Sequence, residues 1–278
     1  MPGSVERIRV VAVTLAVLCA ACTPQAGEQP VSMPTPASAL AIAPDFAGTI
    51  WAATGKKVYR SRDGGHTWRR VPGRAGATGV AFLSTHVVTV GPDGVQVGGF
   101  GAASLGVPRK VAAPLLEVAS PYYRTSRLYA VDSAGRLWVS VRNGKQWARL
   151  RAAGLPSGAV AVAAIRADVH KPDVIYVACG AAGLWRSKDF GATFKRMPRA
   201  GAATAVAATT DDQRLLLVAT PTGIELSKNF GRSFTPVATV RGVRAVAFDL
   251  RNWRLAYAAL ADGRLLRSDD GGGTWDGA

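Results

Sequence analysis

The sequence predicts an all-β protein, a β-propeller of six blades with four antiparallel strands in each blade; a seven-bladed ring is the alternative. Two observations carry this prediction. A motif of the form Ser-x-Asp-x-Gly-x-Thr-aromatic recurs four times, beginning at Ser61, Ser187, Ser227 and Ser268. The last three copies are 40 and 41 residues apart, and each interval holds four short runs of β-forming residues. Four antiparallel strands in about forty residues is the strand count of one propeller blade.

Each copy of the motif predicts a tight turn between two strands. Asp and Asn accept hydrogen bonds from nearby backbone amides, Gly permits a positive φ angle, and Ser or Thr adds a second acceptor. The closing aromatic residue begins the next strand, where its ring can cover the turn. We therefore interpret the motif residues as structural. They are Ser61, Asp63, Gly65, Thr67 and Trp68; Ser187, Asp189, Gly191, Thr193 and Phe194; Ser227, Asn229, Gly231, Ser233 and Phe234; and Ser268, Asp270, Gly272, Thr274 and Trp275.

The blade count follows from the spacing of the motif copies. An imperfect copy of the motif over Ser140–Trp147 retains the Ser, the Gly and the Trp. The 79 residues from Ser61 to Ser140 leave room for two units, so a degenerate copy is expected near Val95–Gly101, where Gly-rich sequence replaces the motif. The total is six units. The first strand of each unit is rich in Ala and Val, as expected where inner strands crowd around a central channel.

The repeated motif resembles the Asp-box repeat, also called the bacterial neuraminidase repeat, of sialidases, sortilin-type receptors and the photosystem II assembly-factor family. The resemblance covers roughly residues 38–278. It implies a propeller whose Asp boxes lie between the third and fourth strands of each blade, on the rim away from the ligand face. It implies no particular activity. The assembly factors use a basic propeller face to bind a protein partner, and they normally have seven blades rather than six.

The N-terminal residues predict export. Two arginines, Arg7 and Arg9, precede an apolar stretch over Val10–Ala21, which has the length of a signal-peptide core and is too short to span a bilayer. The segment Leu18–Cys22 resembles the bacterial lipoprotein box, which implies that Cys22 carries a diacylglyceryl group. Cleavage nearby without lipidation, followed by secretion as a soluble protein, is the alternative.

The predicted domain organisation has three parts. A signal peptide occupies residues 1–21, the lipidated Cys22 and a proline-bearing tether occupy residues 22–37, and the propeller occupies residues 38–278. The protein is then a membrane-anchored lipoprotein, periplasmic or at the cell surface. The last outer strand is expected to be short, and no extra strand is visible that would lock the last blade to the first.

Charge is the second informative feature. The chain has 34 Lys plus Arg against 18 Asp plus Glu, a formal net charge of +16. Such a field attracts anionic surfaces, and for an exported protein an acidic protein or an anionic glycan is favoured over nucleic acid. Every connection from one blade to the next carries at least one cation, so a ring of cations around the channel mouth is a candidate binding face. The candidate residues are Arg74, Arg109, Lys110, Arg151, Arg199, Arg241 and Arg244.

Catalytic interpretations find little support in the sequence. A sialidase needs three arginines on the substrate carboxylate, a Tyr nucleophile paired with Glu, and an Asp acid-base residue. Beyond the signal peptide the only Glu residues are Glu28, Glu117 and Glu225, and Tyr122 and Tyr123 are expected on the face opposite the inter-blade arginines. The histidines His66, His86 and His170 lack metal-ligand spacing, and Cys179 has the context of a buried small hydrophobe.

The favoured interpretation is therefore a non-enzymatic binding or assembly scaffold that uses no cofactor and no metal. It presents a basic propeller face to an acidic protein or glycan. The alternative is a divergent exo-glycosidase of the sialidase type. The two differ in whether a Glu lies within reach of a Tyr hydroxyl beside converging arginines.

Overall fold

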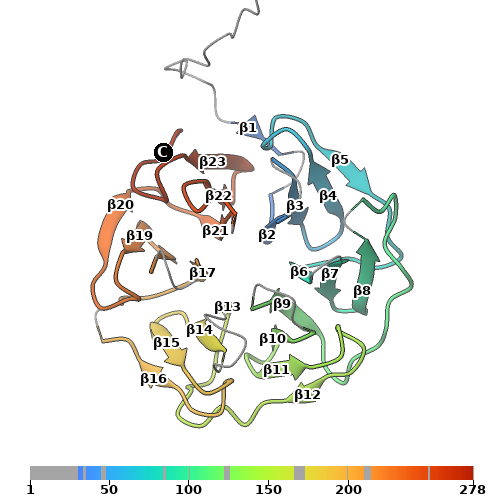
Figure 1. Ribbon diagram of the computed structural model, residues 1–278, viewed down its shortest axis with the longest axis horizontal. Helices are drawn as coiled ribbons and strands as arrows, with labels where there is room; N and C mark the ends of the chain where they lie inside the picture. Colours follow the sequence, from blue (N-terminus) through green and yellow to red (C-terminus); the bar gives the residue numbers. More distant parts are fainter. Residues whose placement is uncertain are drawn as a thin grey trace, which may run out of the picture.

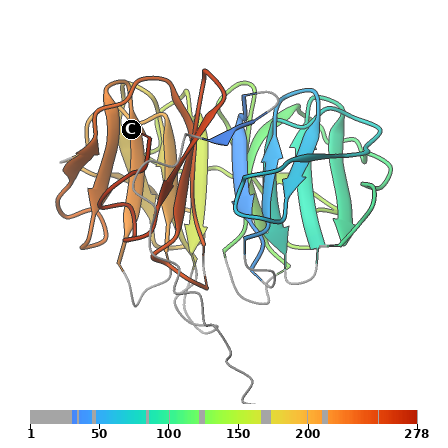
Figure 2. The same ribbon diagram turned by 90° about the horizontal axis from the view of Figure 1, so that it is seen from above.

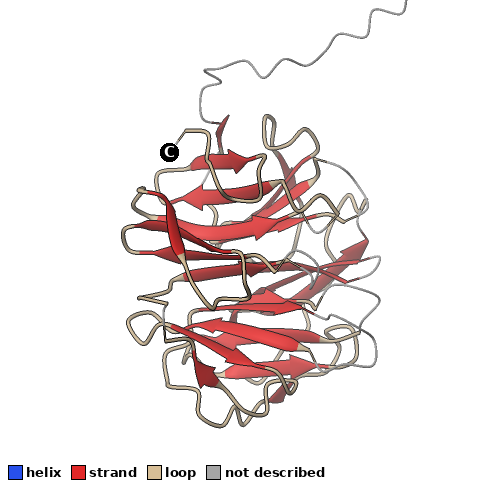
Figure 3. Cartoon of the chain, turned by 60° about the vertical axis from the view of Figure 1, so that its left-hand side comes forward, coloured by secondary structure: helices blue, strands red, loops and turns tan. Residues whose placement is uncertain are grey.

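The structure is a computed structural model that describes residues 31–33, 36–44, 48–83, 86–99, 101–121, 126–165, 173–198, 200–209, 214–249 and 251–277. Six antiparallel sheets are arranged like blades around a central axis, which confirms the predicted six-bladed β-propeller (Figure 1). Seen from the side, the inner strands run roughly along that axis (Figure 2). The described part of the chain contains strands and connecting loops and no helix (Figure 3).

The blades follow one another in chain order. Blade one holds β2 (Ala39–Ile42), β3 (Ile50–Ala53), β4 (Val58–Ser61) and β5 (Arg69–Val71). Blade two holds β6 (Gly79–Leu83), β7 (His86–Gly91) and β8 (Gly94–Gly99). Blade three holds β9 (Leu115–Ala119), β10 (Leu128–Asp132), β11 (Leu137–Ser140) and β12 (Ala148–Arg149). Blade four holds β13 (Ala161–Ile165), β14 (Val174–Ala178), β15 (Leu184–Ser187) and β16 (Lys195–Arg196).

Blade five holds β17 (Ala205–Ala208), β18 (Leu216–Thr220), β19 (Gly223–Ser227) and β20 (Thr235–Ala238). Blade six holds β21 (Val243–Phe248), β22 (Ala256–Leu260), β23 (Arg264–Ser268) and β1 (Val31–Ser32). In each blade the first strand of the meander lies nearest the axis, and these inner strands are β2, β6, β9, β13, β17 and β21 (Figure 1).

Strand β1 closes the ring. It comes from the N-terminal end of the described chain and pairs with β23, so that Val31 lies opposite Leu265 and Ser32 opposite Arg264 (Figure 1). The amide of Met33 also donates to the carbonyl oxygen of Gly263. The expectation that no strand locks the first and last blades is therefore wrong. The expected start of the propeller at residue 38 is also too late, because a two-residue strand between prolines has no periodicity that a sequence can reveal.

Blade two departs from the four-strand pattern. Its sheet has three strands, and a single antiparallel bridge between Val95 and Arg109 stands where the other blades have a fourth strand. The degenerate copy expected near Val95–Gly101 falls mostly on the third strand, β8, and no motif turn follows it. Glycine-rich sequence lacks the side chains that stabilise an outer strand, which explains the loss.

Large aromatic side chains pack in the second strand of four blades. Trp51, Tyr129, Tyr176 and Tyr257 are almost completely buried, and each lies opposite the residue that precedes a motif Ser in the third strand. The hydroxyl of Tyr129 donates to Asp173 Oδ2 over 2.8 Å and so joins blade three to blade four. The hydrophobic clusters likewise span neighbouring blades. The core of this protein thus lies between blades.

We predict that β1 contributes measurably to stability. Deleting residues 1–37 removes its backbone pairing with β23 and should lower the free energy of unfolding by about 2 kcal/mol relative to a chain that begins at residue 31. Thermal and denaturant unfolding of the two chains measures this difference. Equal midpoints would mean that the pairing of β1 does not hold the ring closed.

Candidate functional site

The repeated motif forms the turn between the third and fourth strands, and we call each of these turns a corner. In the first corner Ser61 Oγ donates to Asp63 Oδ1 over 2.7 Å, and the Gly65 amide donates to Ser61 Oγ over 2.8 Å. The Thr67 amide donates to Asp63 Oδ1 over 2.9 Å, and its hydroxyl donates to Oδ2. The same bonds recur in the corners of blades four and six. In blade five Asn229 replaces the Asp and accepts through Oδ1 in the same way, but its Nδ2 donates to Ser233 Oγ over 2.8 Å. The carboxylate of each corner therefore accepts hydrogen bonds from residues of its own turn.

These hydrogen bonds also fix the charge state of the corner carboxylates. Hydrogen bonds from Thr67 and Ser61 lower the pKa of Asp63 to about 2, and hydrogen bonds from Ser187 and Thr193 lower the pKa of Asp189 to about 2. A general acid needs a raised pKa, so these groups are poorly suited to acid catalysis at neutral pH. The corners act as structural elements.

The corners also join neighbouring blades. The glycine at the fifth position of each corner has a positive φ angle and lies against a side chain of the preceding blade. A Cβ atom at Gly65 would lie 2.6 Å from Leu265 Cδ2, and one at Gly272 would lie 2.7 Å from Leu217 Cδ2. Only glycine allows this approach. Each corner thus closes the seam between its own blade and the blade before it.

A further bond, which the sequence did not reveal, ties every corner to its own blade. The amide at the fourth position donates to a carbonyl oxygen of the connection between the first and second strands. The donors and acceptors are Gly64 to Gly48, Asn143 to Ser126, Phe190 to Asp173, Phe230 to Arg214, and Gly271 to Arg254. Two bulky residues, Phe190 and Phe230, accept a positive φ angle at this position. The ring of Phe230 stacks with Arg214 of the same connection, whereas the ring of Phe190 stacks with Arg127 of the corresponding connection in blade three.

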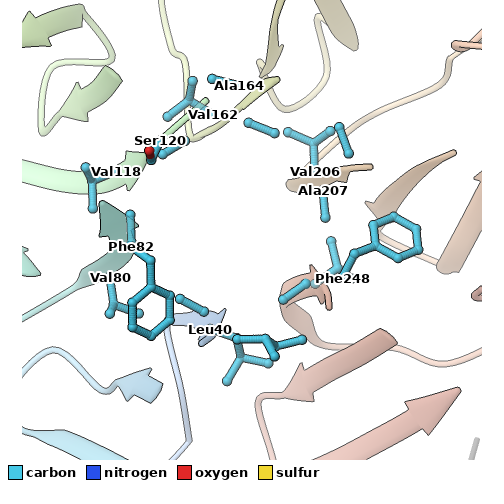
Figure 4. Close-up of a pocket in the computed structure, with 18 of the residues that line it drawn as sticks. Leu40, Val80, Phe82, Val118, Ser120, Val162, Ala164, Val206, Ala207 and Phe248 are labelled. Carbon is cyan, nitrogen blue, oxygen red and sulfur yellow. The ribbon is translucent and has the colours of Figure 1, made fainter. Parts of the chain in front are cut away.

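The central channel is an apolar cavity of about 140 Å³, lined by the inner strands of all six blades (Figure 4). This confirms the expected crowding of Ala and Val around the axis. Figure 4 shows Leu40, Phe82 and Phe248 in this ring of side chains. Among the residues that line the cavity Glu117 is the one ionisable group, and burial raises its pKa to about 8. The Val118 amide donates to Glu117 Oε1 over 3.3 Å.

The structure spreads the candidate cations over a wide surface. Arg74, Arg109, Lys110, Arg151, Arg241 and Arg244 are all exposed, whereas Arg199 lies outside the described residues. Their positions differ in distance from the axis. Arg244 belongs to the inner strand β21, at an irregularity in its pairing with β22, and Arg241 lies just before this strand.

Two of these cations lie towards the outer wall. The Arg74 amide donates to Gln96 Oε1 over 3.0 Å, which places it beside β8, the third strand of blade two. Arg151 lies between Leu150, which faces Gly191, and Ala153, which bridges to Thr193 of the blade-four corner. The backbone of these two residues therefore lies near the outer part of the blades, because the connection between blades first crosses the outer wall before it reaches the next inner strand.

The residues of the enzyme alternative do not assemble among the described parts of the chain. Glu117 lies in an inner strand of blade three and Glu225 in the third strand of blade five, so blade four separates them. Tyr122 and Tyr123 fall outside the described residues. Most other described carboxylates serve corners or ion pairs, such as Asp132 with Arg136 at 2.7 Å.

The histidine and cysteine residues also form no candidate catalytic or metal site among the described residues. No group of three His, Cys, Asp or Glu residues within the described ranges could hold a metal ion, and His170 lies outside those ranges. Cys179 is 4% exposed, which confirms its expected burial, and burial raises the pKa of its thiol to about 11. No described segment forms a helix long and apolar enough to cross a membrane.

Sequence comparison gives one partial relative. No known family model matches the chain. A xyloglucanase of Hypocrea jecorina (strain QM6a) is 30% identical over 161 residues. The matched region is 53% of this chain and 19% of the xyloglucanase, so the chain spans less than a fifth of that relative.

Solved structures with a similar fold belong to proteins of different kinds. A GH74 enzyme of Niastella koreensis is 18% identical, with 84% of this chain and 36% of that chain covered and a TM-score of 0.55. YCF48 from Cyanidioschyzon merolae is 18% identical, with 89% and 86% covered and a TM-score of 0.50. YCF48 bound to a D1 peptide is 16% identical, with 89% and 84% covered and a TM-score of 0.54. At these identities the likeness shows the β-propeller fold alone.

The glycine of a corner gives the first prediction from these contacts. Gly272→Ala adds a Cβ against Leu217 at a positive φ angle and should lower the free energy of unfolding by about 2 to 4 kcal/mol. Gly201→Ala is the matched control, because Gly201 has open space around it and no positive φ angle. Denaturant unfolding compares the two variants. A loss no larger in Gly272→Ala than in Gly201→Ala would show that the seam does not need glycine.

The carboxylate of a corner gives the second prediction. Asp189→Ala removes the acceptor of the Ser187 and Thr193 hydrogen bonds and should lower the free energy of unfolding by about 1 to 3 kcal/mol at pH 7. Because the folded-state pKa lies below the unfolded value, this contribution is present at neutral pH and is lost as pH falls through about 2. An unfolding midpoint that is unmoved at pH 7 contradicts the structural role of the corner carboxylate.

Proposed function

We propose that this chain is an exported, non-enzymatic binding or assembly scaffold that presents the basic surface of its propeller to an acidic protein or an anionic glycan. The main observation in support of this proposal is that the described inter-blade cations are exposed and have no ion-pair partner among the described carboxylates. Most of the described carboxylates are used elsewhere, in corners or in local ion pairs. Such uncompensated charge is available to a partner.

The neighbouring structures support a binding role without deciding it. One of them is YCF48 bound to a D1 peptide, which is an example of a propeller of this fold with a bound peptide. An Arg fork suits the carboxylate oxygens of an acidic protein surface. We therefore favour an acidic protein as the partner of the inter-blade cations, with an anionic glycan as the other class.

Export and lipid anchoring belong to the same proposal. The signal-peptide pattern over residues 1–21 and the lipoprotein-like Cys22 support them, although both lie outside the described residues. With β1 beginning at Val31, the segment between Cys22 and the propeller is eight residues, 23–30. A tether of this length holds the domain close to a membrane surface.

A glycoside hydrolase is the second candidate, and the partial match to a xyloglucanase favours it. Hydrolysis of a glycosidic bond uses two carboxyl groups about 5 to 10 Å apart across the scissile bond. Glu117 and Glu225, which belong to no corner and to no ion pair among the described residues, lie in blades three and five, which are not neighbours. Assays on xyloglucan and on sialosides decide between the candidates, and turnover that is abolished by Glu117→Gln or Glu225→Gln would overturn the scaffold proposal.

The scaffold proposal predicts which charges hold the partner. In the triple variant Arg109→Glu/Arg241→Glu/Arg244→Glu, three exposed cations of the inter-blade connections are reversed, and capture of the partner from membranes at low salt should be abolished. Affinity capture with the lipidated full chain measures this. Stability should change little, because all three side chains are exposed.

The matched control reverses three charges on the face that carries the corners. Arg62, Lys188 and Lys228 occupy the second position of three corners and are exposed. The triple variant Arg62→Glu/Lys188→Glu/Lys228→Glu should retain the partner. Equal loss of partner capture in both triple variants would show that the inter-blade cations do not bind the partner. Capture that survives in the inter-blade triple variant would show the same.

A further inference from the structure

A groove of about 420 Å³ lies on the outer wall of the propeller, at the seam between blades four and five. One side is the outer strand of blade four with the residues that follow it, and the other side is the corner of blade five. The residues that line it are Arg186, Lys195, Arg196, Met197, Pro198, Gly231 and Arg232. None of these residues belongs to the inter-blade cations described above.

The groove is strongly basic. Four of its seven residues are cationic and none is acidic. Lys195, Arg196 and Arg232 are exposed and form no ion pair with a carboxylate of the described residues. The groove therefore concentrates positive charge that no carboxylate of the described residues neutralises.

Two of the cations are held close together by the sheet. Arg186 and Lys195 lie directly opposite each other on β15 and β16, so their side chains share one face of the sheet. Like charges in this position are destabilising, because the Cβ atoms lie about 5 Å apart. Arg186 is also held in place, since its Nη1 donates to the carbonyl oxygen of Phe230 over 3.1 Å. A bound anion would offset this repulsion.

The backbone of the groove has few donors left for a peptide. The Met197 amide donates to Leu184, the Gly231 amide donates to Ser227 Oγ over 2.7 Å, and the Arg232 amide donates to Asn229. Pro198 has no amide hydrogen. A peptide that binds by adding a strand needs free main-chain partners. The groove instead offers side-chain cations, which suit a ligand that presents oxyanions.

The volume and the surface of the groove limit the kinds of ligand that it can bind. The volume falls in the range of about 300 to 1,000 Å³ that small-ligand pockets occupy. Met197 and Gly231 are buried, so the apolar strip of the groove comes from exposed Pro198 and from the aliphatic stems of Lys195 and Arg232. A pyranose ring has an apolar C–H face that can lie on such a strip while its charged substituents reach the arginines.

We propose that the groove between blades four and five binds an anionic saccharide of about two sugar units through its carboxylate or sulfate groups. The site is separate from the inter-blade cations and does not depend on the proposed function. It gives this propeller a second binding surface on its outer wall.

The test is a calorimetric titration of the full chain with a sulfated, uronate-containing disaccharide prepared from heparin. We expect binding that weakens with salt, and no binding of the neutral disaccharide cellobiose. The variant Lys195→Gln/Arg232→Gln should bind at least about tenfold more weakly, because it loses two charge-assisted contacts. Arg196 is left unchanged, since it follows Lys195 on β16 and its Nε donates to the carbonyl oxygen of Ala182 over 3.4 Å, away from the face that Arg186 and Lys195 share. Arg186 is left intact, since its bond to Phe230 also holds two blades together.

The matched control is Arg69→Gln/Lys145→Gln. Arg69 lies opposite Arg60 in blade one as Lys195 lies opposite Arg186 in blade four, and Lys145 occupies the corner position of Arg232. This control removes the same charge from equivalent exposed positions and should bind the disaccharide within about twofold of wild type. The triple variant at Arg109, Arg241 and Arg244 should also bind it normally.

Several results would overturn the proposal. They are unchanged affinity in the Lys195/Arg232 variant, an equal loss in the Arg69/Lys145 control, or tighter binding of triglutamate than of the disaccharide. Unfolding midpoints of both double variants within about 2 °C of wild type show that the fold is intact in each comparison.

Discussion

The rest of the structure depends on the packing of each corner glycine against the blade before it. A propeller blade cannot bury both of its faces alone, so every blade needs a neighbour at a fixed distance. The corner sets that distance, because Gly65 and Gly272 leave no room for a Cβ atom between themselves and the leucines of the preceding blade. The Ser and Asp side chains hold the glycine in its left-handed conformation and satisfy its amide. The motif is therefore a device for joining blades as well as for turning the chain.

This use of the corners shapes the electrostatics of the whole molecule. The corner carboxylates accept hydrogen bonds from their own turns, and the pKa values of Asp63 and Asp189 are lowered accordingly. Three carboxylates, those of Asp63, Asp189 and Asp270, are thus engaged within their own turns, while arginines and lysines outnumber acidic residues in a chain of net charge +16. The excess charge lies in the connections between blades and in the groove between blades four and five. Both surfaces suit anionic partners.

The sequence predicted the features that repeat. The spacing of Ser187, Ser227 and Ser268 set the blade register, and the Ala and Val content of the first strands predicted the apolar channel. It missed β1, because the partner of Val31–Ser32 is more than 200 residues away and two residues carry no periodicity. It missed the groove as well, since Arg186 and Arg232 come together only across a seam. The pair of adjacent cations Lys195 and Arg196, which follows the motif of blade four, was the available sequence signal for the groove. A similar pair, Arg69 and Arg70, follows the motif of blade one.

Hydrogen exchange of the corner amides tests the central claim most directly. The amides of Gly65, Gly191, Gly231 and Gly272 each donate to the buried hydroxyl of a motif Ser at a seam. If the seams hold the ring together, these four amides open only when the whole propeller unfolds and exchange at one common slow rate. Exchange at separate rates, as fast as that of the exposed Gly201 amide, would show that the corners are independent loops and would contradict this account.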